Sequence, residues 1–260
     1  AGVIPGLLLG LVFVIYCIVS AIRHPDRVPM AVEEEVPDSP GQRRSEKISG
    51  TGIILLIFLV LGGIWAGVFT PTEAAGFGVA GSIVLGFAKG MGRKEFIEAI
   101  LDAGRFTAPV MFLLIAGSMY AKLLAVSGSL DMIQMLLTDT GLGTLGLLAI
   151  MTVVWLLLGA LIDSISDILL TVPIFVPMAM AVGIDPVAFA IYGIIIIEAG
   201  LLTPPLGLLV FTVKSSVPDS SVTLSEIFIG AVPYWLLMLF VAVLVIVFPG
   251  LATWLPGLMF

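Results

Sequence analysis

The stretch Glu198-Ala199-Gly200-Leu201-Leu202-Thr203-Pro204-Pro205-Leu206-Gly207 decides how this chain folds. Its two prolines and two glycines cannot all remain in a regular α-helix. Apolar residues precede it from Val187 and resume over 208–213, and each flank is too short to cross a bilayer alone. We therefore expect one transmembrane helix that is broken near its middle. Transporters use the unpaired backbone groups at such breaks as ion and substrate sites; the alternative is a kink that binds nothing.

A second polar stretch lies upstream, at Leu158-Gly159-Ala160-Leu161-Ile162-Asp163-Ser164-Ile165-Ser166-Asp167. Two carboxylates and two hydroxyls interrupt a sequence that is apolar on both sides. The segment 142–183 is long enough for a helical hairpin whose polar turn dips into the membrane. Polar backbone at that depth is tolerated only inside protein or beside a watery cavity, and acids there are candidates for function. An ordinary turn at the membrane interface is the alternative.

The composition of the whole chain indicates a membrane protein. Of 260 residues, 60% are hydrophobic and only 11% are charged, and the mean hydropathy is +1.22, whereas a soluble domain needs more charge to cover its surface. Barrel strands would alternate apolar and polar residues, which these runs do not. The sequence therefore predicts an all-α polytopic membrane protein. The long apolar runs are Val3–Ile22, Ile53–Phe69, Ala74–Lys89, Val110–Val126, Leu142–Ile162 and Val232–Phe248.

The charged residues give an orientation but no partner. The net charge is −7, yet the acids concentrate in the loop 33–46, and no basic surface for nucleic acid is present. Nine of the eleven lysines and arginines lie in 23–47 and 89–105, two helices apart, so both loops should be cytoplasmic and 70–73 should lie outside. We interpret Cys17 as a packing or lipid-facing residue and His24 as an interfacial residue.

Local signals mark where helices begin. Thr70-Pro71-Thr72-Glu73 and Thr223-Leu224-Ser225-Glu226 have the spacing of a capping box, and Asp185-Pro186 that of an N-cap followed by proline. Between 92 and 105, apolar and charged residues alternate with helical period, which predicts an amphipathic helix at the cytoplasmic interface.

Several of these motifs together resemble one transporter family. They are the hairpin turn Gly159–Asp167, the run Gly183–Pro186, the broken-helix motif Gly200–Gly207, the string Gly67–Ala75 and the closing Trp254–Pro256. Taken in their order along the chain, they are similar to the C-terminal part of the large membrane (permease) subunit of TRAP (tripartite ATP-independent periplasmic) transporters. The chain is accordingly expected to be a segment of a longer protein.

The resemblance implies an ion-transporter-type elevator fold with two inverted repeats, each with a re-entrant helical hairpin and a broken transmembrane helix. It implies sodium-coupled uptake of a small organic acid across the bacterial inner membrane by a multi-pass protein that is not an enzyme. Its partners would be a small membrane subunit, a periplasmic substrate-binding protein, the carboxylate substrate and the lipid bilayer. No cofactor is implied beyond Na⁺ as the coupling ion. The first repeat, and with it half of the substrate pocket, is outside this sequence.

The resemblance also implies a sodium site. Its ligands, mostly backbone carbonyls, would be Gly159, Gly200, Thr203 and Leu206. We expect a second set of residues to shape the site: Asp163, Ser164, Ser166, Glu198, Pro204 and Pro205.

Six segments follow from these assignments. They are a transmembrane helix ending the first repeat (1–22), a cytoplasmic linker (23–50), scaffold helices (51–90), an amphipathic interfacial arm (91–105), a transport region with hairpin and broken helix (106–217), and a C-terminal scaffold helix (218–260).

Three other interpretations are open. A stand-alone sodium/dicarboxylate symporter would need no binding protein, and a passive scaffold subunit would have no solute path. An intramembrane aspartyl protease would use Asp163 and Asp167, but the Gly-x-Gly-Asp context of such enzymes is absent.

Overall fold

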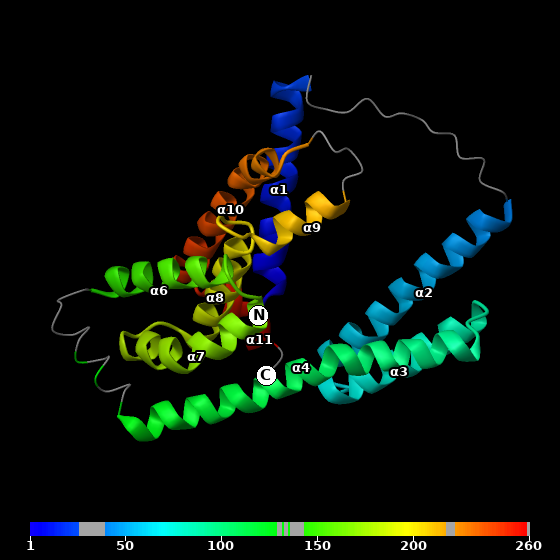
Figure 1. The fold of residues 1–260 in the computed structure, drawn as a ribbon, viewed down its shortest axis with the longest axis horizontal. Helices are drawn as coiled ribbons and strands as arrows, with labels where there is room; N and C mark the ends of the chain where they lie inside the picture. Colours follow the sequence, from blue (N-terminus) through cyan, green and yellow to red (C-terminus); the bar gives the residue numbers. More distant parts are fainter. Residues whose placement is uncertain (26–39, 129–131, 133–134, 136–142, 217–221, 259–260) are drawn as a thin grey trace. The chain divides into compact units, whose positions relative to one another are not determined.

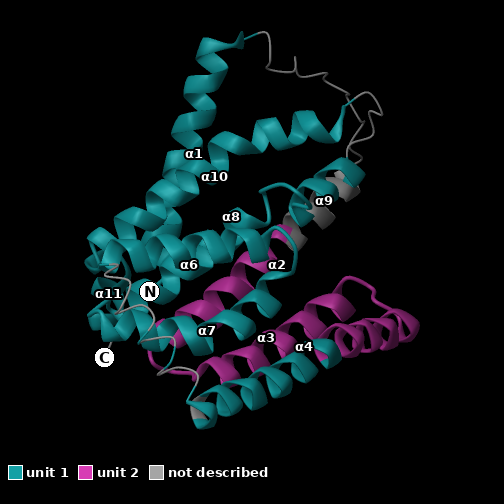
Figure 2. Cartoon of the chain, turned by 60° about the vertical axis from the view of Figure 1, so that its left-hand side comes forward, with its two compact units in different colours: residues 1–27, 108–260 teal, residues 28–107 magenta. Residues whose placement is uncertain are grey.

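The chain folds into α-helices in the part that the computed structural model describes, residues 1–25, 40–128, 132, 135, 143–216 and 222–258 (Figure 1). Figure 2 shows its two compact units, unit 1 of residues 1–27 and 108–260 and unit 2 of residues 28–107. The helices are α1 (Val3–Arg23), α2 (Pro40–Trp65), α3 (Pro71–Ala88), α4 (Arg93–Ser127), α6 (Thr144–Gly159), α7 (Ser164–Ala181), α8 (Pro186–Gly200), α9 (Leu208–Ser216), α10 (Leu224–Val247) and α11 (Gly250–Gly257).

Helix α8 is the centre of unit 1. It packs against α6, α7, α10 and α11, and nine of its fifteen residues are buried. Trp155 of α6 lies in an aromatic cluster with Phe175 of α7 and with Phe189 and Tyr192 of α8, at ring-centroid distances of 5.1–6.1 Å. Gly193 leaves the space that the Trp155 ring fills, because a Cβ there would lie 2.8 Å from the ring. The hairpin α6–α7 is thereby fixed to α8 by aromatic packing.

Unit 2 is a pair of helices, α2 and α3, with the beginning of α4. Glycines on α3 allow the two helices to approach closely, since a Cβ on Gly78 would lie 3.1 Å from Val60 and one on Gly81 would lie 2.3 Å from Leu56. Ala74 is the one residue of α3 that is buried. Most of the apolar surface of these helices is therefore left exposed within the described chain.

The predicted helix starts are confirmed. The Thr70 hydroxyl accepts a hydrogen bond from the Glu73 N–H at 3.3 Å, and the Glu73 carboxylate accepts one from the Thr70 N–H at 2.8 Å. Thr223 and Glu226 form the same box at the start of α10. Asp185 caps α8 through the N–H groups of residues 187 and 188.

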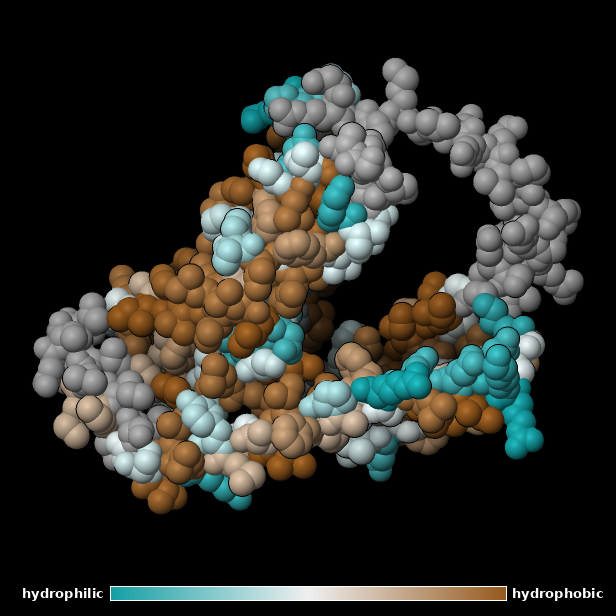
Figure 3. Space-filling view, viewed as in Figure 1, coloured by the Kyte–Doolittle hydropathy of each residue, from teal (hydrophilic) through white to brown (hydrophobic). Residues whose placement is uncertain are grey.

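Several helices are long and apolar enough to cross a bilayer. By length and composition, Val3–Arg23, Arg93–Leu124, Ser164–Ala181 and Leu224–Val247 qualify, and Gly50–Trp65, Thr144–Gly159 and Pro186–Gly200 are shorter apolar helices. Figure 3 shows apolar side chains covering much of the surface over α6 and α10, and hydrophilic ones where α3 ends and α4 begins. An all-α polytopic membrane protein is therefore confirmed.

Two observed boundaries differ from the expected segments. Helix α2 begins at Pro40, inside the segment 23–50 expected as a linker, of which residues 26–39 lie outside the described residues. The amphipathic helix expected at 91–105 continues as α4 to Ser127, because residues 106–108 contain no helix breaker and Pro109 leaves the helix unbroken. Helix α10, expected as scaffold, packs against α8 in unit 1.

Candidate functional site at the hairpin turn and the helix break

The two polar stretches of the sequence meet in the structure through their glycines. An ideal Cβ on Gly159 would lie 2.7 Å from the Ile197 carbonyl oxygen and 3.1 Å from the Gly200 Cα. A Cβ on Gly200 would lie 2.9 Å from the Gly159 Cα. The end of α6 and the end of α8 are therefore in direct backbone contact, which no larger residue permits.

A backbone hydrogen bond extends this contact from the hairpin turn to the loop after α8. The Gly207 N–H donates to the Ala160 carbonyl at 3.3 Å. Gly207 has a φ of +58°, and a Cβ there would lie 2.6 Å from the Phe228 ring, so both the backbone conformation and the space require glycine. The turn and the break are thus held together at both ends of the loop 201–207.

The break itself exposes oxygen atoms. The Thr203 hydroxyl donates to the Ala199 carbonyl at 2.9 Å, and the Thr203 N–H donates to the Gly200 carbonyl at 2.8 Å. Within the described part of the chain, no hydrogen-bond donor reaches the carbonyls of Thr203 or Leu206. Pro204 and Pro205, joined by a cis peptide bond, are exposed and have no N–H to offer. The loop therefore presents carbonyl oxygens and one hydroxyl.

The hairpin tip is built around Asp163, the N-cap of α7. Its carboxylate accepts hydrogen bonds from the N–H groups of Ile165 and Ser166, both at 3.1 Å, and from the Ser166 hydroxyl at 2.5 Å. The Ser164 hydroxyl donates to Glu198 of α8 at 2.8 Å. Asp163 and Ser166 therefore order the tip, and Ser164 and Glu198 attach it to α8. Among the described residues, no hydrogen bond joins Asp163 or Ser166 to the loop 201–207.

One residue of the hairpin was not among the predicted site residues. Asp167 is fully buried, with 0% of its surface exposed, and neither carboxylate oxygen has a hydrogen-bond partner. The sequence showed an acid at the turn but could not show which of two neighbouring aspartates is enclosed. In the structure Asp167 lies four residues before Thr171, whose hydroxyl accepts from the Trp155 indole, so both residues are on the buried face of α7.

The donor set suits a hard monovalent cation better than a transition metal. Carbonyl and hydroxyl oxygens are the ligands that hard cations take. In the residues that the structure describes, no three His, Cys, Asp or Glu side chains converge as a metal site. Of the residues predicted as sodium ligands, Gly159 and Gly200 are in backbone contact, and Thr203 and Leu206 lie in the loop between α8 and α9.

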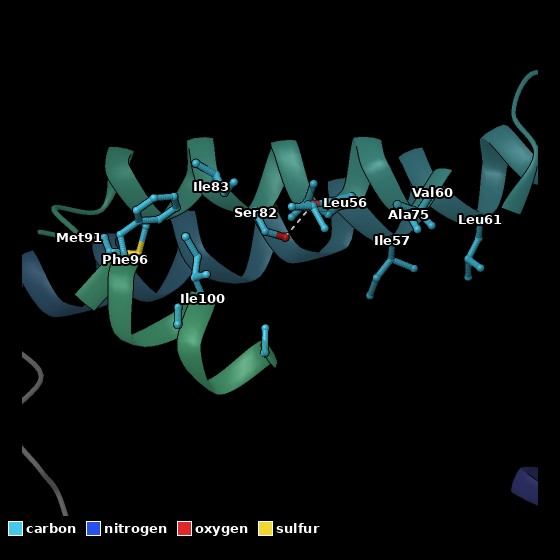
Figure 4. Close-up of a pocket in the computed structure, with 14 residues that line it drawn as sticks. Leu56, Ile57, Val60, Leu61, Ala75, Ser82, Ile83, Met91, Phe96 and Ile100 are labelled. Atoms are coloured by element: carbon cyan, nitrogen blue, oxygen red, sulfur yellow. Dashed lines mark hydrogen bonds between the residues drawn. The ribbon is translucent and has the colours of Figure 1, made fainter. Parts of the chain in front are cut away.

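Unit 2 carries an apolar surface, in contrast to the oxygen-rich junction of unit 1. A groove of about 750 Å³ lies between α2, α3 and the first turns of α4. Figure 4 shows apolar side chains around it, among them Leu56, Val60 and Ile100, with the Ser82 hydroxyl bonded to its own helix at the Gly78 carbonyl, 2.8 Å away. With no free polar group, this groove fits an apolar surface and not a charged solute.

The comparison with known families decides the identity of this arrangement. The family described as "Tripartite ATP-independent periplasmic transporter, DctM component" matches residues 1–251. The chain belongs to this family. It is therefore a multi-pass inner-membrane protein of a transporter family and not an enzyme.

Curated relatives agree with this TRAP permease assignment. The chain is 32% identical over 261 residues to the C4-dicarboxylate TRAP transporter large permease protein of Pseudomonas aeruginosa, covering 99% of the chain and 58% of the relative. It is 32% identical to the sialic acid TRAP transporter large permease of Vibrio cholerae (99% and 59%) and 28% identical to the ectoine/5-hydroxyectoine permease of Ruegeria pomeroyi (100% and 59%). The chain spans about three-fifths of the length of these relatives.

Proposed function

We propose that this chain is part of a sodium-coupled TRAP permease that takes up a small organic acid by an elevator mechanism. The observation that carries the proposal is the backbone contact between Gly159 and Gly200, which joins the hairpin turn to the helix break. A transporter that couples an ion to a moving hairpin needs the ion site to be shared between these two elements.

Sodium coupling is supported by the oxygen atoms at this junction. The loop 201–207 offers the free carbonyls of Thr203 and Leu206, and the Thr203 hydroxyl has lone pairs left after donating to Ala199. A sodium ion bound here would lie between α6 and α8 and stabilise their contact. Release of the ion would leave several backbone dipoles unpaired in an apolar surrounding, which is costly.

The division into two units supports the elevator mechanism. The hairpin, the break and α10 belong to one compact unit, while α2 and α3 belong to the other. We propose that unit 1 moves the site across the membrane and that unit 2 is static. Helix α4, which begins in unit 2 and ends in unit 1, is the connecting arm.

The substrate class and the partners follow from the relatives. Their names specify C4-dicarboxylates, sialic acid and ectoine. A carboxylate is common to all three, so we propose a small carboxylated solute, delivered by a periplasmic binding protein to a permease that also holds a small membrane subunit. The re-entrant hairpin α6–α7 would contribute its tip, with Asp163 and Ser166, to the substrate side of the site.

The variant Thr203→Val in the full-length protein tests the sodium site. Valine keeps the shape of threonine and removes one oxygen ligand, so about tenfold more sodium should be needed for half-maximal uptake, as loss of about 1.4 kcal/mol of binding gives. The measurement is uptake into proteoliposomes containing permease, small subunit and binding protein, at varied sodium concentration.

A matched control is Thr212→Val in α9. The Thr212 hydroxyl also donates to the carbonyl four residues before it, Leu208, at 3.1 Å, but it lies outside the break. This variant should keep the sodium dependence of the parent. Equal sodium curves for Thr203→Val and the parent would refute Thr203 as a ligand.

A further inference from the structure

Asp167 is the one buried acid of the described chain that the proposed sodium site does not use. It lies in the first turn of α7, on the face that also carries Thr171 and Phe175 and that packs against α6 and α8. One turn before it, Ser164 bonds to Glu198, and one turn after it, Thr171 bonds to Trp155. Asp167 is therefore enclosed between two formed side-chain contacts, and both of its carboxylate oxygens are without a partner.

Among the described residues, no cation or hydrogen-bond donor pairs with the Asp167 carboxylate. Helix α6 has no titratable residue, and α8 contributes an acid, Glu198, and the phenol of Tyr192. On its own helix the nearest charged group is Asp163, another acid. Helix α4, which meets α7 where Gly117 lies against Leu169, carries Tyr120 and Lys122. None of these groups forms an ion pair or hydrogen bond with the Asp167 carboxyl.

A metal cation would not find a coordination shell there either. The Thr171 hydroxyl donates to the Asp167 backbone carbonyl and accepts from Trp155, and the Ser164 hydroxyl donates to Glu198. A sodium ion needs several oxygen ligands, whereas a proton needs only the carboxyl itself. The dipole of α7 favours a negative charge at its first turn, but Asp163 already accepts the N–H groups that express this effect. The cost of burying an unpaired carboxylate exceeds the stabilisation that the helix dipole still provides. A carboxyl in such a place therefore takes up a proton and becomes neutral.

We propose that Asp167 is a proton-binding site: in this packing of the hairpin on α8 its carboxyl is the neutral acid. Release of the proton to water would create a buried, unpaired carboxylate and would force α7 away from α6 and α8. The proton is thus a second ligand of the hairpin, separate from the ion bound at the break.

Infrared spectroscopy of the purified full-length protein at neutral pH tests this proposal without a transport assay. The band of a protonated carboxyl should be present in the parent, shift in D₂O, and be lost in Asp167→Asn. The matched control is Asp163→Asn, which removes an acid four residues away that accepts three hydrogen bonds and should leave the band unchanged.

Three results would overturn the proposal. They are the absence of any protonated-carboxyl band in the parent, an unchanged band in Asp167→Asn, or loss of the band on adding sodium chloride at constant pH, which would make Asp167 a sodium site. The first and third are measured on the parent alone, so the test holds even where the asparagine variant does not fold. If Thr203→Val keeps the sodium dependence of the parent, the sodium ligand is refuted, but the infrared evidence for a protonated Asp167 is not affected.

Discussion

Unit 1 and unit 2 solve the same problem, close helix packing in an apolar surrounding, in different ways. In unit 1, glycines bring backbone against backbone at Gly159 and Gly200, and a backbone hydrogen bond from Gly207 to Ala160 follows. In unit 2, glycines on α3 receive the side chains of Leu56 and Val60, so the contact is made by side chains against backbone.

This difference between side-chain packing and backbone packing indicates where an ion can be bound. Side-chain packing into glycine positions, as in unit 2, produces a stable apolar surface and a groove suited to another apolar surface. Backbone-to-backbone packing at helix ends, as in unit 1, leaves carbonyls at the junction that must find a partner. The first kind suits a fixed scaffold, and the second kind suits a site whose occupancy changes.

The largest expected effect is on uptake after crosslinking, which should differ between a link inside unit 2 and a link from unit 1 to unit 2. In a Cys17→Ser background, cysteines at Val60 and Gly78 should be joined by a short bis-methanethiosulfonate reagent without loss of uptake, because both lie in unit 2. A cysteine at the half-buried Ser166, joined to cysteines scanned along α3, should abolish uptake until dithiothreitol is added, because that link ties unit 1 to unit 2. The measurement is proteoliposome uptake before and after reduction.

The outcome that breaks the comparison is equal uptake with both crosslinks in place. Unit 1 would then not move relative to unit 2, and the elevator mechanism would be wrong. Loss of uptake with the link inside unit 2 would show that this unit also changes its packing during transport.

The substitution Gly200→Ala should have the next largest effect. Its Cβ would lie 2.9 Å from a backbone atom of Gly159, which cannot move aside as a side chain end does. We expect a loss of about 1–3 kcal/mol in the free energy of unfolding, as overpacking costs, together with strongly reduced uptake. Thermal unfolding and uptake of the purified full-length variant are the measurements.

Gly76→Ala in α3 is the matched control. No atom lies within 4 Å of a Cβ at that position, so replacing glycine in a helix should raise stability by about 0.5–1 kcal/mol. If Gly200→Ala proves as stable as Gly76→Ala, the ends of α6 and α8 are not in backbone contact. The proposal of an ion site shared between them would then be wrong.

The sequence predicted the elements of this site better than their connections. Pro204, Pro205 and the glycines forbid a continuous helix, so the break could be located from local chemistry alone. The contact of Gly159 with Gly200 is a long-range event, and only the family resemblance pointed to it. The burial of Asp167 depends on how α7 turns toward α6 and α8, which two acids four residues apart do not reveal.

The boundaries of α4 show a different limit. The apolar–charged period of 92–105 and the apolar run 110–126 differ in composition, which predicted two elements. The backbone stays helical across this change in composition, and α4 continues through Pro109 to Ser127. The division between the two compact units falls near Thr107, inside this one continuous helix.

The smallest expected effect compares the two capping boxes. Thr70→Ala and Thr223→Ala each remove a side-chain acceptor at 3.3 Å from the N–H of the glutamate three residues later, and each should cost about 1 kcal/mol. The local consequence should differ, because α10 has four buried residues and α3 has one. Amide hydrogen exchange should therefore speed up more in the first turn of α3 than in that of α10.

The pH dependence of the Thr70 box sharpens this test. Hydrogen bonds from the Thr70 N–H and hydroxyl lower the pKa of Glu73, an exposed group, below its ordinary range. Its contribution to α3 is thus present above the pKa of the unfolded chain and is lost as the pH falls through the lower folded value. The exchange difference between the parent and Thr70→Ala should accordingly persist at neutral pH and shrink in acid. A difference that grows on acidification, or equal fraying of α3 and α10, would mean that packing and not the cap holds the start of α3.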